Sequence, residues 1–336
     1  MKWYENMRSV ASYEEYPPPH SHILILGWPT ARQSWLTDYP FVHVDRIYAE
    51  NLSPLAKRCQ TLSFHTPKFL HRIALLSPHH WYGAWTTSIE NYDAIILLNE
   101  VRGRDVFEFI LKKNPHCRLS VFYDSPIEHG SRKDPSHYRD LPIHFCTCDR
   151  KIATEYHLPF LPYFYIFSPH RFAQYAHLPV AKIERDVFFV GEAKGTRKKE
   201  LSQIAAALEN AGLTYEFRLV RQRRHGHHWQ DASTDYLPYS QVIHRIESSR
   251  AILELISNGQ TGLTQRPYEA LFFRKKLITN SDEVRHYDFY RPENIFILGK
   301  RNMEDLPQFL RAPYQPLPET IINQYDFLHW LTHFYQ

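Results

Sequence analysis

The sequence predicts an α/β fold built from two doubly wound parallel sheets, one in each half of the chain. Short apolar runs typical of buried parallel strands alternate with segments of helical periodicity. The same alternation begins again after a proline- and aromatic-rich stretch near the middle of the chain. Because 336 residues suffice for two domains with a core each, we expect domains over residues 1–165 and 166–336, facing each other across a cleft.

In the first half, the run His22–Gly27 is almost entirely apolar and predicts the first buried strand. The segment Arg104–Lys113 predicts an amphipathic helix, because its apolar residues from Val106 to Leu111 recur at helical spacing. Further strands are expected at Phe41–Ile47, Ala94–Leu98, Arg118–Tyr123 and Ile143–Cys146. Strand, helix and strand in this order imply right-handed crossovers and a doubly wound, Rossmann-like layer.

The connection between the halves is expected over Leu158–Pro179, which has no clear period. Beyond it, strands are expected at Asp186–Val190, Thr214–Val220, Ala251–Ile256 and Lys276–Thr279. Helices are expected at Arg197–Ala211, Tyr239–Ser249 and about Thr264–Phe273. Apolar residues within Pro318–Phe334 predict a terminal helix packed on a domain surface, with a return to the first domain as one option.

Composition limits the classes of partner and compartment. The formal charge of +4 is too small to indicate nucleic acid, and no such partner is expected. The four cysteines, Cys59, Cys117, Cys146 and Cys148, fit neither a disulfide framework nor a zinc site, so reduced thiols in a cytoplasmic protein are expected. The sequence shows no signal peptide and no run of ~18 apolar residues, which predicts a soluble protein, peripheral to a membrane at most.

Two histidine-rich spots raise the question of a metal. One is His79-His80, and the other holds His225, His227 and His228 in a basic loop. Neither spot has acidic or thiol neighbours of the kind that zinc sites use, and we expect no bound metal. The basic loop is either a solvated surface loop, which we favour, or a rim that contacts phosphate.

A first candidate for anion binding follows the predicted strand Asp186–Val190. Gly191 at the strand exit permits close backbone approach, and Lys194 and Arg197 carry charges suited to a diphosphate. A turn glycine followed by a solvated basic helix start explains the same residues equally well.

A second candidate is the run from Gly262 to Glu269. Thr264 is a good N-cap for the helix that follows, and Arg266 and Glu269 share one face because they are three residues apart. The helix dipole alone explains a carboxylate in the first turn, but it disfavours Arg266 there. A bound anion reverses that cost, so we expect a phosphate near Arg266.

These residues carry a resemblance to a known family. The order F-V-G-x-x-K-G-x-R, then A-I-L-E-L, Q-x-G-L-T-x-R-x-x-E-A-L and K-K-L-I-T-N resembles the donor half of bacterial GT-B glycosyltransferases of lipopolysaccharide and surface-polysaccharide loci. The downstream stretch Tyr287–Ile295 fits as well. The resemblance covers the second half; the first half is similar only in outline, at Tyr92–Ile96, Lys112–Pro115 and Phe122–Ile127.

The resemblance implies a transferase that moves a sugar from a nucleotide-activated donor to a lipopolysaccharide or other surface glycan, at the cytoplasmic face of the inner membrane. Glu269 would bind the ribose, while Arg266, Thr264 and Gly262 would face the phosphates. Lys194 and Arg197, with Gly191 beside them, would stabilise the departing diphosphate without a metal. The chain departs from the pattern at Gly27-Trp28-Pro29, where many members carry a glycine-rich loop.

The catalytic base and the reaction class stay open in the sequence. Asp124 and Glu128 follow the predicted strand Arg118–Tyr123, where a base could reach a cleft, although Asp124 also suits a turn start. A retaining enzyme needs no such base. Two other functions share a two-domain α/β architecture, namely a nucleotide-sugar 2-epimerase and a non-catalytic sugar- or nucleotide-binding protein.

Overall fold

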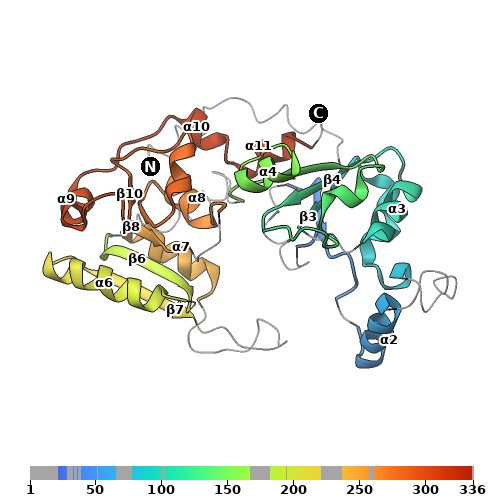
Figure 1. The fold of residues 1–336 in the computed structure, drawn as a ribbon, viewed down its shortest axis with the longest axis horizontal. Helices are drawn as coiled ribbons and strands as arrows, with labels where there is room; N and C mark the ends of the chain where they lie inside the picture. Colours follow the sequence, from blue (N-terminus) through green and yellow to red (C-terminus); the bar gives the residue numbers. More distant parts are fainter. Residues whose placement is uncertain are drawn as a thin grey trace. The chain divides into compact units, whose positions relative to one another are not determined.

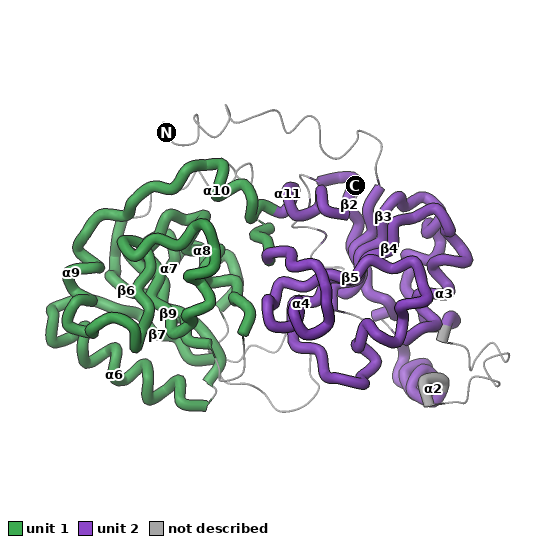
Figure 2. Tube along the Cα trace, turned by 45° about the horizontal axis from the view of Figure 1, so that its top comes forward, with its two compact units in different colours: residues 1–7, 163–326 green, residues 8–162, 327–336 purple. Residues whose placement is uncertain are grey.

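The computed structural model describes residues 22–28, 33, 36, 39–50, 52–65, 78–99, 101, 103–166, 182–193, 195–220, 237–256 and 261–334. The α/β class is confirmed, with two parallel sheets of five strands each (Figure 1). Contacts divide the described residues into two compact units. We call residues 22–162 with 327–334 the N-terminal unit, and residues 163–326 the C-terminal unit (Figure 2).

The sheet of the N-terminal unit has the strand order β2-β1-β3-β4-β5, and every neighbouring pair is parallel. Its strands are β1 (Ile23–Leu26), β2 (Val42–Asp45), β3 (Ala94–Leu98), β4 (Arg118–Tyr123) and β5 (His144–Thr147). Strands β1 and β3 are buried along their whole length, as continuous apolar runs predict for a sheet covered on both faces.

Helix α3 (Arg104–Lys113) covers one face of this sheet. It buries Val106, Phe107 and Ile110 against alternate strand residues that include Leu24, Ile95 and Val121. The remaining helices of the described N-terminal unit are α2 (Pro54–His65), α4 (Arg150–Tyr156) and α11 (Phe327–Thr332). Helix α2 was not expected, because its few apolar residues do not gather on one helix face.

The sheet of the C-terminal unit has the order β10-β9-β8-β6-β7, again all parallel. Its strands are β6 (Arg185–Glu192), β7 (Tyr215–Val220), β8 (Ser249–Glu254), β9 (Lys276–Thr279) and β10 (Ile295–Ile297). Its helices are α6 (Arg197–Asn210), α7 (Tyr239–Glu247), α8 (Gln265–Phe272), α9 (Leu306–Arg311) and α10 (Glu319–Asn323). The strand and helix order of this half therefore follows the sequence prediction as far as β9, and β10 and α9 are added.

Both faces of this second sheet are covered. Helices α6 and α9 share one apolar core with alternate strand residues such as Val187, Leu253 and Phe296. Helix α7 contacts β8 and β6, and helix α8 contacts β8 and β9. In each unit the first strand lies between the second and the third, so the strand order reverses beside β1 and beside β6. The carboxyl ends of strands at such a reversal are the usual binding place of doubly wound sheets.

The prediction of one terminal helix over Pro318–Phe334 is wrong. Two short helices, α10 and α11, are separated by residues 324–326, where the Tyr165 amide donates to the Tyr325 carbonyl and Tyr165 forms a bridge with Asp326. The helical spacing of the apolar residues suggested a single helix, but these residues pack in two different cores. Those before residue 327 pack in the C-terminal unit and the later ones in the N-terminal unit (Figure 2).

The part of the predicted connection beyond Ile166 lies outside the described residues. Among the described residues, no helix has the length and apolar character needed to cross a bilayer.

Helix α11 gives a test of this division. Trp330 is buried and meets Phe122 of β4 edge-to-face at 5.1 Å between ring centroids. We expect Trp330→Ala to destabilise the N-terminal unit by about 3–5 kcal/mol, because a buried indole and its packing are lost. Hydrogen exchange should accelerate in β1, β3 and β4 but not in β6 or β8.

The matched control is Leu55→Ala on the exposed side of α2, which should change stability by less than about 0.5 kcal/mol. Equal loss of protection in both sheets after Trp330→Ala would contradict the assignment of α11 to the N-terminal unit.

Candidate functional site

Arg197 joins the two strands that flank the reversal in the C-terminal sheet. Its guanidinium donates through Nη1 to the Glu192 carbonyl at 2.6 Å, and through Nη2 to the Leu255 carbonyl at 2.5 Å. These carbonyls lie at the carboxyl ends of β6 and β8. Two of five N–H donors are thus used within the fold, so Arg197 holds the strand ends together whatever else it binds.

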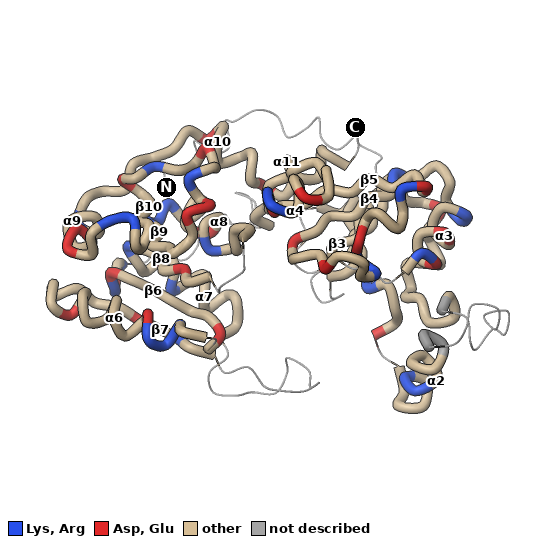
Figure 3. The backbone as a smooth tube through the Cα atoms, in the orientation of Figure 1, with Lys and Arg blue, Asp and Glu red and all other residues tan. Residues whose placement is uncertain are grey.

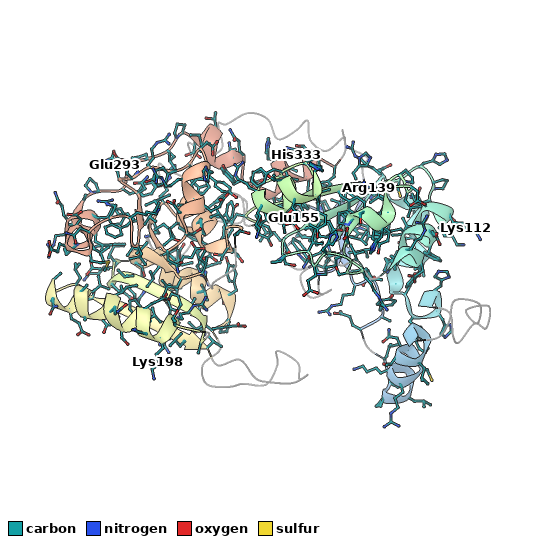
Figure 4. All side chains as sticks on the ribbon, in the orientation of Figure 1. Lys112, Arg139, Glu155, Lys198, Glu293 and His333 are labelled. Atoms are coloured by element: carbon teal, nitrogen blue, oxygen red, sulfur yellow. The ribbon has the colours of Figure 1, made fainter. Side chains whose placement is uncertain are left out.

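Gly191 makes this arrangement possible. A Cβ at this position would lie 2.9 Å from Cζ of Phe189 and 3.4 Å from Nη1 of Arg197. Gly191 therefore lies within β6 and not in a turn, and Arg197 is bonded to the backbone instead of being solvated, so the glycine has a packing reason that the sequence did not predict. Lys194 lies outside the described residues. Lys198, the next residue along α6, instead projects away from the unit (Figure 4).

Thr264 caps helix α8, as expected, and a buried carboxylate supports the cap. Thr264 Oγ1 accepts from the Arg266 amide at 3.1 Å and donates to Glu254 at the end of β8. The other oxygen of Glu254 accepts from Thr279 Oγ1 at 2.6 Å. Burial raises the pKa of the Glu254 carboxyl. Sequence reasoning missed Glu254, although an acidic residue within the predicted apolar strand Ala251–Ile256 was a usable signal.

Arg266 and Glu269 meet in the first turn of α8, as their spacing predicts. Their side chains form an ion pair in which Glu269 is 0% exposed and Arg266 is 23% exposed. The second oxygen of Glu269 accepts from the Tyr239 hydroxyl at 2.9 Å. Both carboxylate oxygens therefore have partners within the unit, and Arg266 is the member of the pair that reaches the surface.

Tyr239 connects this pair to further polar groups. Because its one hydroxyl proton is given to Glu269, Tyr239 accepts from Gln265 Nε2 at 2.8 Å and from the Tyr165 hydroxyl at 3.0 Å. Burial, and then the charge of Glu269, raise the pKa of Tyr165 and of Tyr239, so both phenols remain donors at neutral pH. We call Tyr239, Glu254, Thr264, Arg266 and Glu269 the α8 cluster.

The α8 cluster offers its positive charge mainly through a side chain. Within the first turn, Pro267 has no amide hydrogen and the Arg266 amide is bonded to Thr264. Burial alone would lower the pKa of Arg266, but the charge and hydrogen bond of Glu269 outweigh it and raise that pKa. Gly262 is partly exposed two residues before the cap. An anion here would be held first by the guanidinium.

No protein-family model matches the chain, and no curated protein matches its sequence. The resemblance to GT-B glycosyltransferases therefore depends on the motifs themselves.

Asp124 and Glu128 are both exposed in the segment that follows β4. Both follow the carboxyl end of β4 along the chain. Nearby, Asn99 at the end of β3 has a left-handed backbone with φ 52°, and its Nδ2 donates to Ser125. The Oδ1 atom of Asn99 is buried and has no hydrogen-bond partner among the described residues. A left-handed asparagine at a sheet reversal is a feature that sequence patterns do not show.

The same segment contains a histidine backed by a buried carboxylate. Nδ1 of His129 lies 3.3 Å from Asp134, and the two side chains are 87% and 1% exposed. Asp134 also accepts from the amides of Gly130 at 2.8 Å and Ser136 at 2.9 Å. With Nδ1 directed at Asp134, Nε2 of His129 is left toward solvent as a proton acceptor. Sequence reasoning missed this pair, which has no diagnostic spacing.

The structure describes one of the two histidine-rich spots and all four cysteines. His79 and His80 are exposed beside aromatic rings, and His225, His227 and His228 lie outside the described residues. Within the described ranges no three side chains form a metal-binding group. All four cysteines are free, and burial raises the pKa of Cys117 to about 11 and of Cys146 to about 12, so these two thiols stay protonated.

Asp134 makes a pH-dependent contribution that can be measured. Burial would raise its pKa, but hydrogen bonds from Ser136 and Gly130 outweigh that effect and lower the pKa to about 2. The carboxylate therefore stabilises the fold above its unfolded pKa near 3.8, and the stabilisation is lost as pH falls toward 2. Compared with Asp134→Asn, the wild-type free energy of unfolding should fall by about 1 to 2 kcal/mol more between pH 4 and 2.

Urea titrations at several pH values provide that comparison. His129→Gln is the control, because it removes the exposed partner and keeps the amide hydrogen bonds to Asp134. Parallel pH profiles for wild type and Asp134→Asn would show that this carboxylate has no lowered pKa.

Proposed function

We propose that the chain is a GT-B type glycosyltransferase that moves a sugar from a nucleotide-activated donor to a lipopolysaccharide or other surface glycan, at the cytoplasmic face of the inner membrane and without a metal. The observation that carries the proposal is the Arg266 guanidinium, held at the carboxyl edge of the C-terminal sheet by a buried carboxylate. Its place in the first turn of a helix is unfavourable in the absence of an anion.

The geometry suits Arg266 to a diphosphate. Glu269 and Tyr239 fix one side of the guanidinium and its partner, so a ligand would order little that is not already ordered. The remaining N–H groups can bind phosphate oxygens in a bidentate manner. As the bond from the sugar to the diphosphate breaks, the guanidinium would stabilise the charge that grows on the departing oxygens.

In this proposal, Glu269 is a positioning residue that holds Arg266 in place. The ribose contact implied by the family resemblance needs an additional hydrogen bond to one of its oxygens, both of which have partners. Release of Tyr239 would provide that oxygen. Arg197 and Lys194 keep the role proposed for them near the diphosphate, with Arg197 limited to the donors that its two carbonyl contacts leave.

His129 is the group we propose as the base, ahead of Asp124 and Glu128. Nε2 of His129 takes the proton of the acceptor hydroxyl while that oxygen forms a bond to the anomeric carbon and the diphosphate leaves. Asp134 stabilises the imidazolium that results, as a carboxylate does behind a catalytic histidine. This role requires an inverting reaction.

An epimerase and a non-catalytic binding protein remain the alternative functions. Incubation with nucleotide-sugar alone distinguishes them, because an epimerase releases altered sugar without an acceptor and a binding protein leaves the donor intact. The intermixing of Lys and Arg with Asp and Glu along both units does not favour a nucleic-acid partner (Figure 3).

Replacing the guanidinium tests the donor site. We expect Arg266→Met to lower kcat/KM for transfer by about 10²–10³-fold and to weaken nucleoside diphosphate binding, because charge stabilisation of the leaving group is lost. Transfer of labelled sugar and calorimetric titration with the diphosphate measure the two effects.

Arg285→Met is the matched control, since Arg285 is an exposed arginine of the same unit that pairs with Asp282. It should leave both quantities unchanged. Full transfer activity in folded Arg266→Met would refute this donor site.

Replacing the imidazole tests the base separately. We expect His129→Ala to lower kcat by about 10²–10⁴-fold while nucleotide affinity stays at the wild-type value, because the proton acceptor touches only the acceptor hydroxyl. His116→Ala is the control: this exposed histidine precedes β4 at the opposite edge of the sheet. A weaker nucleotide affinity with unchanged kcat would assign His129 to the donor instead.

A further inference from the structure

A cavity of about 350 Å³ lies in the C-terminal unit. Its lining includes Lys276, Glu293, Arg301, Gln308 and Phe309. Lys276 begins β9, and Glu293 precedes β10. The cavity therefore lies toward the amino ends of the strands, whereas the α8 cluster lies at their carboxyl ends.

Two cations face this cavity without an acidic partner. Lys276 is only 3% exposed, and its ammonium donates to the Phe309 carbonyl. Arg301 donates through Nη1 to the Pro292 carbonyl at 2.9 Å. The Phe309 ring lies 4.3 Å from the Lys276 ammonium and 5.4 Å from the Arg301 guanidinium carbon. Among the described residues, neither cation has a carboxylate within ion-pair distance.

A purely structural role explains only part of this arrangement. The Phe309 carbonyl is one of the last four of helix α9, so a lysine can cap that helix end and use one of its three donors. Capping by Lys276 does not explain Arg301, whose guanidinium carbon also lies 4.7 Å from the Phe296 ring centroid, but a contact with a ring face needs none of its N–H donors. Burial and the charge of Arg301 both lower the pKa of Lys276, with Glu293 acting in the opposite direction. The two cations therefore repel each other where a ligand could enter.

The cavity is larger than an inorganic ion needs, and its lining changes character across it. An oxyanion would meet the ammonium and the guanidinium, which bind phosphate and carboxylate oxygens well. Glu293 and Asp305 also line the cavity and are exposed, and Glu293 lies at the periphery of the unit in Figure 4. Carboxylates there would repel a second anionic group but would accept hydrogen bonds from hydroxyls.

We propose that this cavity is a binding site for a small hydroxylated oxyanion of sugar-phosphate type, with the anionic group between Lys276 and Arg301 and the hydroxyls toward Glu293, Asp305 and Gln308. The site is separate from the donor site and does not depend on the proposed transferase function. Its occupation joins β9, the residues before β10 and helix α9 through one ligand.

Calorimetric titration of the whole chain with glucose 6-phosphate tests the proposal. We expect saturable binding that glucose does not reproduce, because the neutral sugar lacks the oxyanion. Lys276→Met and Arg301→Met should each weaken the affinity by about tenfold or more, since each removes a charge-assisted contact. Methionine keeps much of the apolar stem in both cases, and Arg301→Met serves if Lys276→Met fails to fold.

Two controls locate the binding. Lys300→Met removes a neighbouring exposed cation that pairs with Asp282 at 3.5 Å, and Arg266→Met removes the cation of the α8 cluster. Lys300→Met should bind glucose 6-phosphate like the wild type, and Arg266→Met should keep the binding event that Arg301→Met weakens. Gluconate and inorganic phosphate then show whether a carboxylate or a bare phosphate suffices.

No binding of any of these oxyanions to the wild type would overturn the proposal, as would equal weakening by Lys300→Met. Loss of binding in Arg266→Met, with Arg301→Met unaffected, would assign the oxyanion to the carboxyl edge instead.

Discussion

Two buried carboxylates hold the first turn of α8 against the rest of its unit. Glu254 reaches from the end of β8 to the capping hydroxyl of Thr264 and to Thr279 of the next strand. Glu269 lies one turn further and holds Arg266 and Tyr239. Because a buried carboxylate without donors would be very costly, the positions of these donors are tightly determined by the two acids. The placement of the Arg266 guanidinium follows from that constraint.

Much of the fold could be predicted from the sequence because its signals are local. Continuous apolar runs such as Ala94–Leu98 predicted strands whose ends lie within two residues of those observed, and the helical spacing in Arg104–Lys113 predicted α3. The terminal segment failed for a physical reason. Helical spacing shows that residues lie on one face, but not that they pack in one core, and the apolar residues on either side of Asp326 belong to different units.

The candidate site likewise contains contacts that local sequence patterns predict and contacts that they do not. Arg266 and Glu269 could be paired from sequence since residues three apart on a helix are neighbours. The contact of Arg197 with the Leu255 carbonyl joins positions 58 residues apart, and Glu254 and Thr279 are 25 apart. Such contacts depend on strand order, which no local pattern contains. His129 and Asp134 are close in sequence, but they meet through an irregular segment with no period to predict it.

The energetics of the Arg266–Glu269 pair favour a functional explanation for its retention. An ion pair with one fully buried member recovers its desolvation cost only in part, and apolar residues of similar volume often give equal or greater stability. The pair also places a cation at the helix end where the dipole disfavours it. Both costs fall if an anion binds the exposed side of the guanidinium, since the anion is attracted by the arginine and by the helix end together. If the pair contributed only to stability, apolar residues such as leucine and methionine would stabilise the fold equally well or better.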